Sequence, residues 1–160
     1  MITDENKRGL SKILRSQITC SGQLVETIQD EQAALARRDI NALEAITRIK
    51  LELTERIEQL ELDRNNLLKS LGYTENPDGM NELLTTLDDA SGLKAAWQQV
   101  LENIRICRDK NLTNGAVLEL GRRQAEYALS ILRQQHEPHE TYGAEGQKAT
   151  AFGNRELGKA

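Results

Sequence analysis

The sequence is poor in the residues that build aromatic pockets, disulfides and helix breaks. Its 160 residues include one Trp, one Phe, three Tyr, two Cys and two Pro. So little aromatic surface argues against a deep, ring-lined pocket for a large planar cofactor. Cys20 and Cys107 both fall on or beside helical apolar stripes, which predicts free, buried thiols. The abundant Leu, Ala, Glu, Gln and Arg favour helix over sheet.

Long apolar runs are also missing, so no segment is suited to cross a bilayer and we expect no membrane insertion. The first residues are polar and acidic, unlike those of a secretory signal peptide, which predicts a cytoplasmic protein. The net charge is −4, and basic and acidic residues are interspersed along the chain. This arrangement argues against a nucleic-acid partner, because such binding needs clustered Lys and Arg.

No sequence motif for catalysis or cofactor binding is present. There is no Gly-rich phosphate loop and no nucleophile elbow, and no serine stands in a recognisable relation to a histidine that could act as its base. His136 and His139 invite comparison with a metal site, but Pro138 between them prevents a shared face of a regular helix. We therefore expect no enzymatic activity, no cofactor and no metal ion.

One stretch, residues 93–132, contains no proline and carries seam residues in alternating steps of four and three. This heptad pattern predicts a long helix that packs along its whole length against other helices. Asn111 and Asn114 lie in the seam, where we expect them to set the helix register or to bond a facing backbone. Gly115 follows and would let a neighbouring helix come close. The complete seam reads Leu93, Trp97, Val100, Ile104, Cys107, Asn111, Asn114, Leu118, Gly121, Ala125, Ala128 and Leu132.

Two further long helices and one short helix precede this stretch. Asp39 is a suitable N-cap for the second long helix and Gly72 a suitable residue to end it. Lys50 and Arg64 occupy heptad positions of that helix, where we expect packed stems and charged groups in water. The role of the 72–92 linker, which holds the short helix, is open. The predicted helices span about residues 4–36, 40–71, 80–87 and 93–135.

The predicted fold is all-α. It is an elongated antiparallel bundle of three long helices with coiled-coil-like packing, one short connecting helix and a mobile C-terminal tail. The tail, residues 136–160, has only Tyr142, Phe152 and Leu157 as large apolar side chains. Because this is too little apolar surface to order the segment alone, we predict a bundle over residues 1–135 and a flexible tail that orders on a partner.

Three stretches carry a resemblance to a known family. They are KLEL (50–53) with LELDRNNLL (60–68) and LG (71–72), NLTNG (111–115) with ALSIL (128–132), and TYGAEGQ (141–147). The helical stretches would match many coiled coils, whereas the asparagine pair with its glycine, in register with the TYGxxGQ segment, is specific. Together they resemble the FlgN family of flagellar type III export chaperones.

The resemblance implies a bacterial cytosolic chaperone for the hook–filament junction proteins FlgK and FlgL. Such a chaperone holds the C-terminal helical segment of its client and prevents premature association. It then delivers the client to the export gate protein FlhA, at the inner face of the flagellar export apparatus. The resemblance places the contacts with client and gate in the C-terminal part of the chain, and the matching tail residues are Tyr142, Gly143 and Gly146.

The residues themselves point to the same end of the chain. An amphipathic client helix needs an apolar surface to receive it, and the long helix offers Tyr127, Ile131 and Leu132. We expect the client helix to pack there while the tail, with Phe152 and Leu157, orders around it. Ordinary packing within the chain is the alternative for these helix residues. Tyr142 either packs back on the bundle or is an aromatic anchor that a partner buries.

A different class of function also fits the pattern. A structural coiled-coil scaffold or adaptor, whose helices pair between chains, would need no client. A chaperone is expected to be a small monomer or dimer that binds a defined helix, whereas a scaffold forms larger oligomers alone. An apolar stripe left for a client is equally suited to self-pairing, so a homodimer is open.

Overall fold

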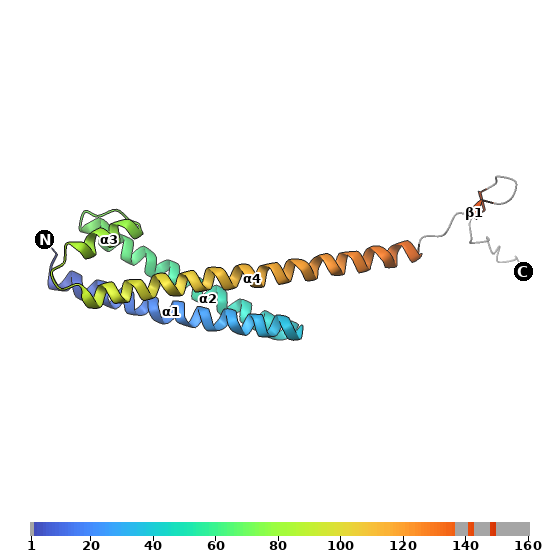
Figure 1. Ribbon diagram of the computed structural model, residues 1–160, viewed down its shortest axis with the longest axis horizontal. Helices are drawn as coiled ribbons and strands as arrows, with labels where there is room; N and C mark the ends of the chain where they lie inside the picture. The colour runs from blue at the N-terminus through green and yellow to red at the C-terminus, as the bar shows by residue number, and fades with distance from the viewer. Residues whose placement is uncertain (1, 137–140, 143–147, 150–160) are drawn as a thin grey trace, which may run out of the picture. The chain divides into compact units, whose positions relative to one another are not determined.

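The computed structural model describes residues 2–136, 141–142 and 148–149 of the chain (Figure 1). Helices account for most of these residues, and the all-α class with three long helices and one short connecting helix is confirmed. Two strands of two residues each have no counterpart in the prediction; they pair antiparallel, with Thr141 opposite Ala149 and Tyr142 opposite Lys148. The elements are α1 (Asp4–Arg37), α2 (Ile40–Ser70), α3 (Pro77–Thr85), α4 (Ser91–His136), β1 (Thr141–Tyr142) and β2 (Lys148–Ala149).

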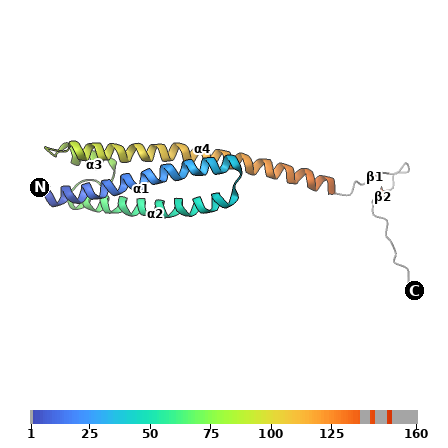
Figure 2. The same cartoon turned by 90° about the horizontal axis from the view of Figure 1, so that it is seen from below.

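A two-residue turn reverses the chain between α1 and α2, which lie antiparallel (Figure 2). Arg38 has the left-handed conformation, with φ 55° and ψ 37°. Its amide donates to Leu35 O at 3.2 Å, and the amide of Asp39 donates to Ala34 O at 3.0 Å. Asp39 Oδ1 accepts from the amide of Ala42 at 3.0 Å, so the predicted N-cap of α2 is confirmed.

The short helix begins earlier than predicted. Asn76 is its N-cap and accepts from the amide of Gly79 at 2.9 Å, and Pro77 occupies the first helical position, where a missing N–H costs nothing. The cluster of turn residues before residue 80 is therefore a helix start, and α3 ends at Thr85 rather than at residue 87. The backbone of Thr74 lies so close to residue 79 that only glycine fits there, because an added Cβ would lie 2.0 Å from Thr74 O.

The long helices contact one another through heptad seams, as the coiled-coil-like prediction expects. In α1 the seam includes polar residues at three positions, and every member is buried or half-buried. Such a strict succession of four- and three-residue steps keeps one face of a helix toward its partners. The seam of α1 reads Leu10, Leu14, Gln17, Ser21, Leu24, Ile28, Glu31 and Leu35.

The apolar core is concentrated where α3 meets the long helices. Trp97 is almost fully buried there, and its Nε1 donates to Asn81 Oδ1 of α3 at 3.0 Å. The segment that connects α2 to α4, including α3, supplies half of this cluster, so its role is to close one end of the core. The buried cluster consists of Leu10, Leu14, Leu68, Met80, Leu83, Leu84, Leu87, Ala90, Trp97 and Val100.

The seam of α4 is buried only in part. Asn114 is 2% exposed, whereas the seam residues Leu118 and Leu132 are 51% and 52% exposed. The prediction that this helix packs along its whole length is therefore wrong after Asn114. The chain divides into two compact units, Met1–Val117 and Leu118–Ala160. The predicted boundary between a bundle and a tail at residue 135 stays a prediction.

Replacement of Arg38 by glycine is expected to stabilise the protein. A residue with a Cβ loses about 1–2 kcal/mol in the left-handed region, and glycine's greater freedom in the unfolded chain offsets part of that gain. We expect Arg38→Gly to raise the free energy of unfolding in urea by about 0.5–1 kcal/mol. The matched control is Arg37→Gly within α1, which should lower it by a similar amount. Equal destabilisation by both changes would contradict this explanation.

Candidate functional site

A polar network joins the three long helices of the first unit. Lys50 Nζ of α2 lies 2.9 and 3.0 Å from the two carboxylate oxygens of Glu31 of α1 and 2.8 Å from Asn111 Oδ1 of α4. Asn114 Nδ2 donates to Glu31 Oε2 at 2.8 Å and to Ile28 O at 3.0 Å. The Glu31 side chain is only 8% exposed. A buried carboxylate is tolerated because these donors surround it.

This network favours one relative register of the three helices, since a slip of α2 would remove the Lys50 donor from the Glu31 carboxylate and a slip of α4 would remove the Asn114 donor. Asn111 and Asn114 thus contact facing helices, Asn111 by a hydrogen bond from Lys50 and Asn114 by hydrogen bonds to a backbone carbonyl and a carboxylate.

The structure does not support the expectation that a neighbouring helix comes close to Gly115. A Cβ added there would meet nothing within 4 Å among the described residues, so no helix comes close to it in this part of the chain.

The expectation that the charged group lies in water is wrong for Arg64, whereas the Lys50 side chain remains 23% exposed. The Lys50 ammonium group is held in the network described above, and the Arg64 side chain is 3% exposed. Arg64 Cζ lies 4.8 Å from the centroid of the Trp97 ring. Its Nη2 donates to Glu61 at 3.3 Å and to Asn65 at 3.1 Å. Burial lowers the pKa of the Arg64 guanidinium, and the Glu61 carboxylate opposes that shift.

A second set of buried polar contacts links α1 and α4. Asn103 Nδ2 donates to Ser21 Oγ at 3.0 Å and to Ile18 O at 3.4 Å. Cys107 Sγ lies 3.7 Å from Ser21 O, and burial raises the pKa of the Cys107 thiol. Cys107 and Cys20 are both free and buried, as predicted. Glu31, Ser21 and Asn103 were not predicted as buried contacts, although the steps of four and three residues along α1 pass through the first two.

The second unit presents an apolar helix face to solvent. The predicted partner-binding residues Tyr127, Ile131 and Leu132 all lie on α4 and are 70%, 38% and 52% exposed. At 3.6 residues per turn, the apolar side chains from Leu118 to Leu132 span an arc of about 200° around the helix. No charged residue falls within this arc. The exposed large side chains on it are Leu118, Leu120, Tyr127, Leu129, Ile131 and Leu132.

The opposite face of this helix neutralises its own charges. Arg122 contacts Glu119 at 2.8 Å and also pairs with Glu126, and Arg123 contacts Glu119 at 2.9 Å. Hydrogen bonds from Arg122 and Arg123 lower the pKa of the Glu119 carboxyl, and Glu119 in turn raises the pKa of Arg122. Ion pairs at these spacings keep a helix soluble and support it without tertiary contacts. The contrast between the two faces makes the apolar arc the candidate site.

The predicted tail residues fall mostly outside the described part of the chain. Tyr142 lies in β1, where its backbone pairs with that of Lys148. Gly143, Gly146, Phe152 and Leu157 lie outside the described residues, as does His139.

Among the residues that are described, no three His, Cys, Asp or Glu side chains gather as they would around a metal ion. Nor does any helix in those ranges have the length and apolar character needed to cross a membrane.

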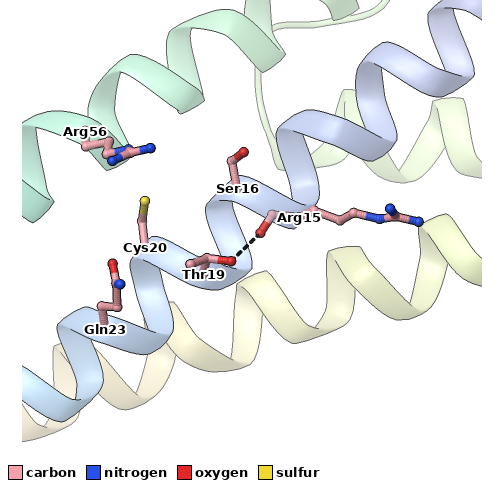
Figure 3. A pocket seen from close by; sticks show the side chains of 6 residues that line it. All are labelled: Arg15, Ser16, Thr19, Cys20, Gln23 and Arg56. Carbon is pink, nitrogen blue, oxygen red and sulfur yellow. Dashed lines mark hydrogen bonds between the residues drawn. The ribbon is translucent and has the colours of Figure 1, made fainter.

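A hollow of about 360 Å³ opens between α1 and α2 (Figure 3). Arg56 of α2 lies across from Cys20 and Ser16 of α1, while the Arg15 side chain points away from them. The Thr19 hydroxyl donates to Arg15 O of its own helix at 3.1 Å. The thiol and hydroxyls of this hollow have no histidine or carboxylate among its lining residues to act as a base. The hollow therefore lacks an activated nucleophile.

Comparison with known proteins agrees with this architecture. A crystal structure of a protein from Pseudomonas aeruginosa, described as a flagella synthesis protein FlgN, has a similar fold. Its TM-score is 0.61 and its sequence identity 23%, and the match covers 67% of this chain and 84% of that one. No curated protein sequence matches the chain. The fold thus places the protein in the class of all-α bundle proteins.

The family follows from the sequence itself. The profile of the FlgN protein family matches residues 1–150, and the chain belongs to the FlgN family. The match includes the helices that form the polar network and the exposed face of α4. Membership in this family supports a role as a flagellar export chaperone.

The polar network makes a prediction about stability. Lys50→Met leaves the Glu31 carboxylate with fewer donors, so we expect the free energy of unfolding to fall by about 1–3 kcal/mol. Adding Glu31→Gln should restore part of this loss, because the amide carries no charge. Lys69 pairs with Glu75 at the surface, so Lys69→Met is the control and should cost less than about 1 kcal/mol. Urea denaturation of the four proteins measures these effects. Equal losses for Lys50→Met and Lys69→Met would contradict the role of the network.

Proposed function

We propose that the protein is a cytoplasmic flagellar export chaperone for the hook–filament junction proteins FlgK and FlgL. It binds the C-terminal helical segment of the client, prevents premature association and delivers the client to the export gate protein FlhA at the inner face of the export apparatus. The exposed apolar arc of α4, from Leu118 to Leu132, is the observation that carries this proposal. Family membership supports its flagellar part.

The chemistry of the arc fits a helical client. A helix that displays leucine, tyrosine and alanine at helical spacing is complementary to the apolar face of another amphipathic helix. Burying such a surface is favourable by about 25 cal/mol for each Å² of apolar area removed from water. The proposal involves no nucleotide hydrolysis, because the recognition needs only this burial.

A scaffold function would use the same surface differently. Two copies could cover each other's apolar arcs and build an assembly without a client. Light scattering of the purified chain distinguishes the two functions, since a chaperone is a monomer or dimer and a scaffold forms larger oligomers. Family membership favours the chaperone.

Leu132→Asp tests the client site directly. A carboxylate on the apolar arc must be desolvated when a client helix covers it, so we expect affinity for a C-terminal segment of FlgK or FlgL to fall by at least about tenfold. Isothermal titration calorimetry measures the affinity, and circular dichroism should show helicity close to that of the parent chain. Leu51→Asp is the control, since Leu51 lies on α2 and is 61% exposed. Unchanged affinity of the Leu132→Asp variant would contradict the proposed site.

Tyr142→Ala tests the proposed contact with the gate. If Tyr142 is an aromatic anchor that FlhA buries, its loss should weaken binding to FlhA by about tenfold or more without a change in melting temperature. Client affinity in the same variant is the internal control. A lower melting temperature with unchanged FlhA affinity would show instead that the tyrosine packs on its own chain. Unchanged values in both measurements would remove Tyr142 from the proposed site.

A further inference from the structure

The apolar arc on the second part of α4 is too wide for one partner helix. A helix that packs on one neighbour or core has an apolar stripe of at least about 100°, and this arc spans about twice that, about 200° at 3.6 residues per turn. Tyr127 and Leu120 mark one edge of the arc, and Leu129 marks the other. All three side chains are more than half exposed, at 70%, 58% and 52%.

Most of the arc falls on two heptad seams that run side by side, and Leu129 lies beside the first of them. Both follow steps of three and four residues, which is the spacing that keeps a seam facing one partner helix. Their centres lie about 100° apart around α4, from the residue positions at 3.6 residues per turn. The first seam is Leu118, Gly121, Ala125, Ala128 and Leu132, and the second seam is Leu120, Gln124, Tyr127 and Ile131.

The two seams differ in what they would accept. The first seam is lined in its middle by Gly121, Ala125 and Ala128, so it fits a partner helix that brings large apolar side chains. A second copy of this chain that presented the same seam would set Gly and Ala against Gly and Ala there and would bury little apolar area. The second seam carries Leu120, Tyr127 and Ile131, which supply bulk of their own.

The charged residues leave both seams open. Glu119, Arg122, Arg123, Glu126 and Arg133 all fall on the remaining part of the helix circumference. Because all five lie outside the arc, no charged residue falls within either seam. The first four also form ion pairs among themselves. A helix with two apolar seams and one polar face has the pattern of a member of a three-helix bundle, which contacts two neighbours.

We propose that a single client chain places two amphipathic helices on α4, one on each seam, and so completes a three-helix bundle with it. This inference rests on the proposed chaperone function and specifies the form of the client, which is a helical pair rather than one helix. The helix on the first seam carries large apolar side chains at its facing positions. The helix on the second seam packs against Leu120, Tyr127 and Ile131.

Two pairs of substitutions separate the seams. Leu118→Gln with Ala125→Gln alters the first seam, and Leu120→Gln with Ile131→Gln alters the second; glutamine keeps helix propensity. Ser130→Gln on the polar face is the control. With intact FlgK as the probe, we expect each seam variant of the full chain to bind about tenfold or more weakly and the control to bind normally by calorimetry.

Hydrogen exchange of the bound client then assigns the two helices. The wild-type chaperone should protect two client segments from hydrogen exchange. In complexes with the two seam variants, a different segment should lose this protection in each case. Native mass spectrometry should show one chaperone with one client. A seam variant that binds as tightly as wild type, one protected client segment, or a complex in which a second chaperone covers a seam would overturn the inference while leaving the chaperone function intact. Absence of any binding by the wild-type chain would contradict the proposed function, and this inference with it.

Discussion

The carboxylate of Glu31 is the constraint on which the bundle of the first unit depends. It is nearly buried, and its donors come from two other helices, Lys50 of α2 and Asn114 of α4. A buried charge is destabilising unless it is paired and hydrogen-bonded, so the alignment that keeps both donors is favoured over one that loses either of them. Apolar seams alone would tolerate a shift by one heptad, because leucine packs equally well against the next leucine. The network removes that freedom and specifies register.

The polar contacts that favour one register and the apolar core lie at different places along the long helices. The apolar cluster gathers where α3 meets the long helices, and the polar seam residues Glu31, Lys50 and Asn114 lie nearer the turn at Arg38. Polar seam positions contribute less burial, so most of the hydrophobic stabilisation must come from the end that α3 closes. This explains why the connection between α2 and α4 is long: a tight turn could not supply Met80, Leu83, Leu84 and Leu87 to the core.

The helices could be predicted from the sequence because their period is strong, and the long ones end within about two residues of their predicted bounds. The burial of the polar residues was harder to predict from the sequence. Glu31 and Arg64 read as surface residues by type, and only the tertiary contacts with Lys50 and Trp97 show why they are inside. For α4, a continuous heptad pattern indicates that a face is apolar but does not state what covers it. Packing along the whole helix was therefore predicted where the structure shows exposure after Asn114.

That face of α4 is exposed from Leu118 to Leu132 in the described part of the chain. Gly121 weakens the helix relative to alanine by about 1 kcal/mol, yet a Cβ there would meet no atom within 4 Å in the described residues. Tyr127, Leu120 and Leu129 expose more than half of their surface on the same helix. Contiguous apolar patches promote aggregation and mark interaction sites in soluble proteins. The charged face, on which Arg122 and Glu119 form an ion pair, favours solubility of a helix whose other face is apolar. The features that destabilise this helix in isolation are thus the ones that suit it to binding.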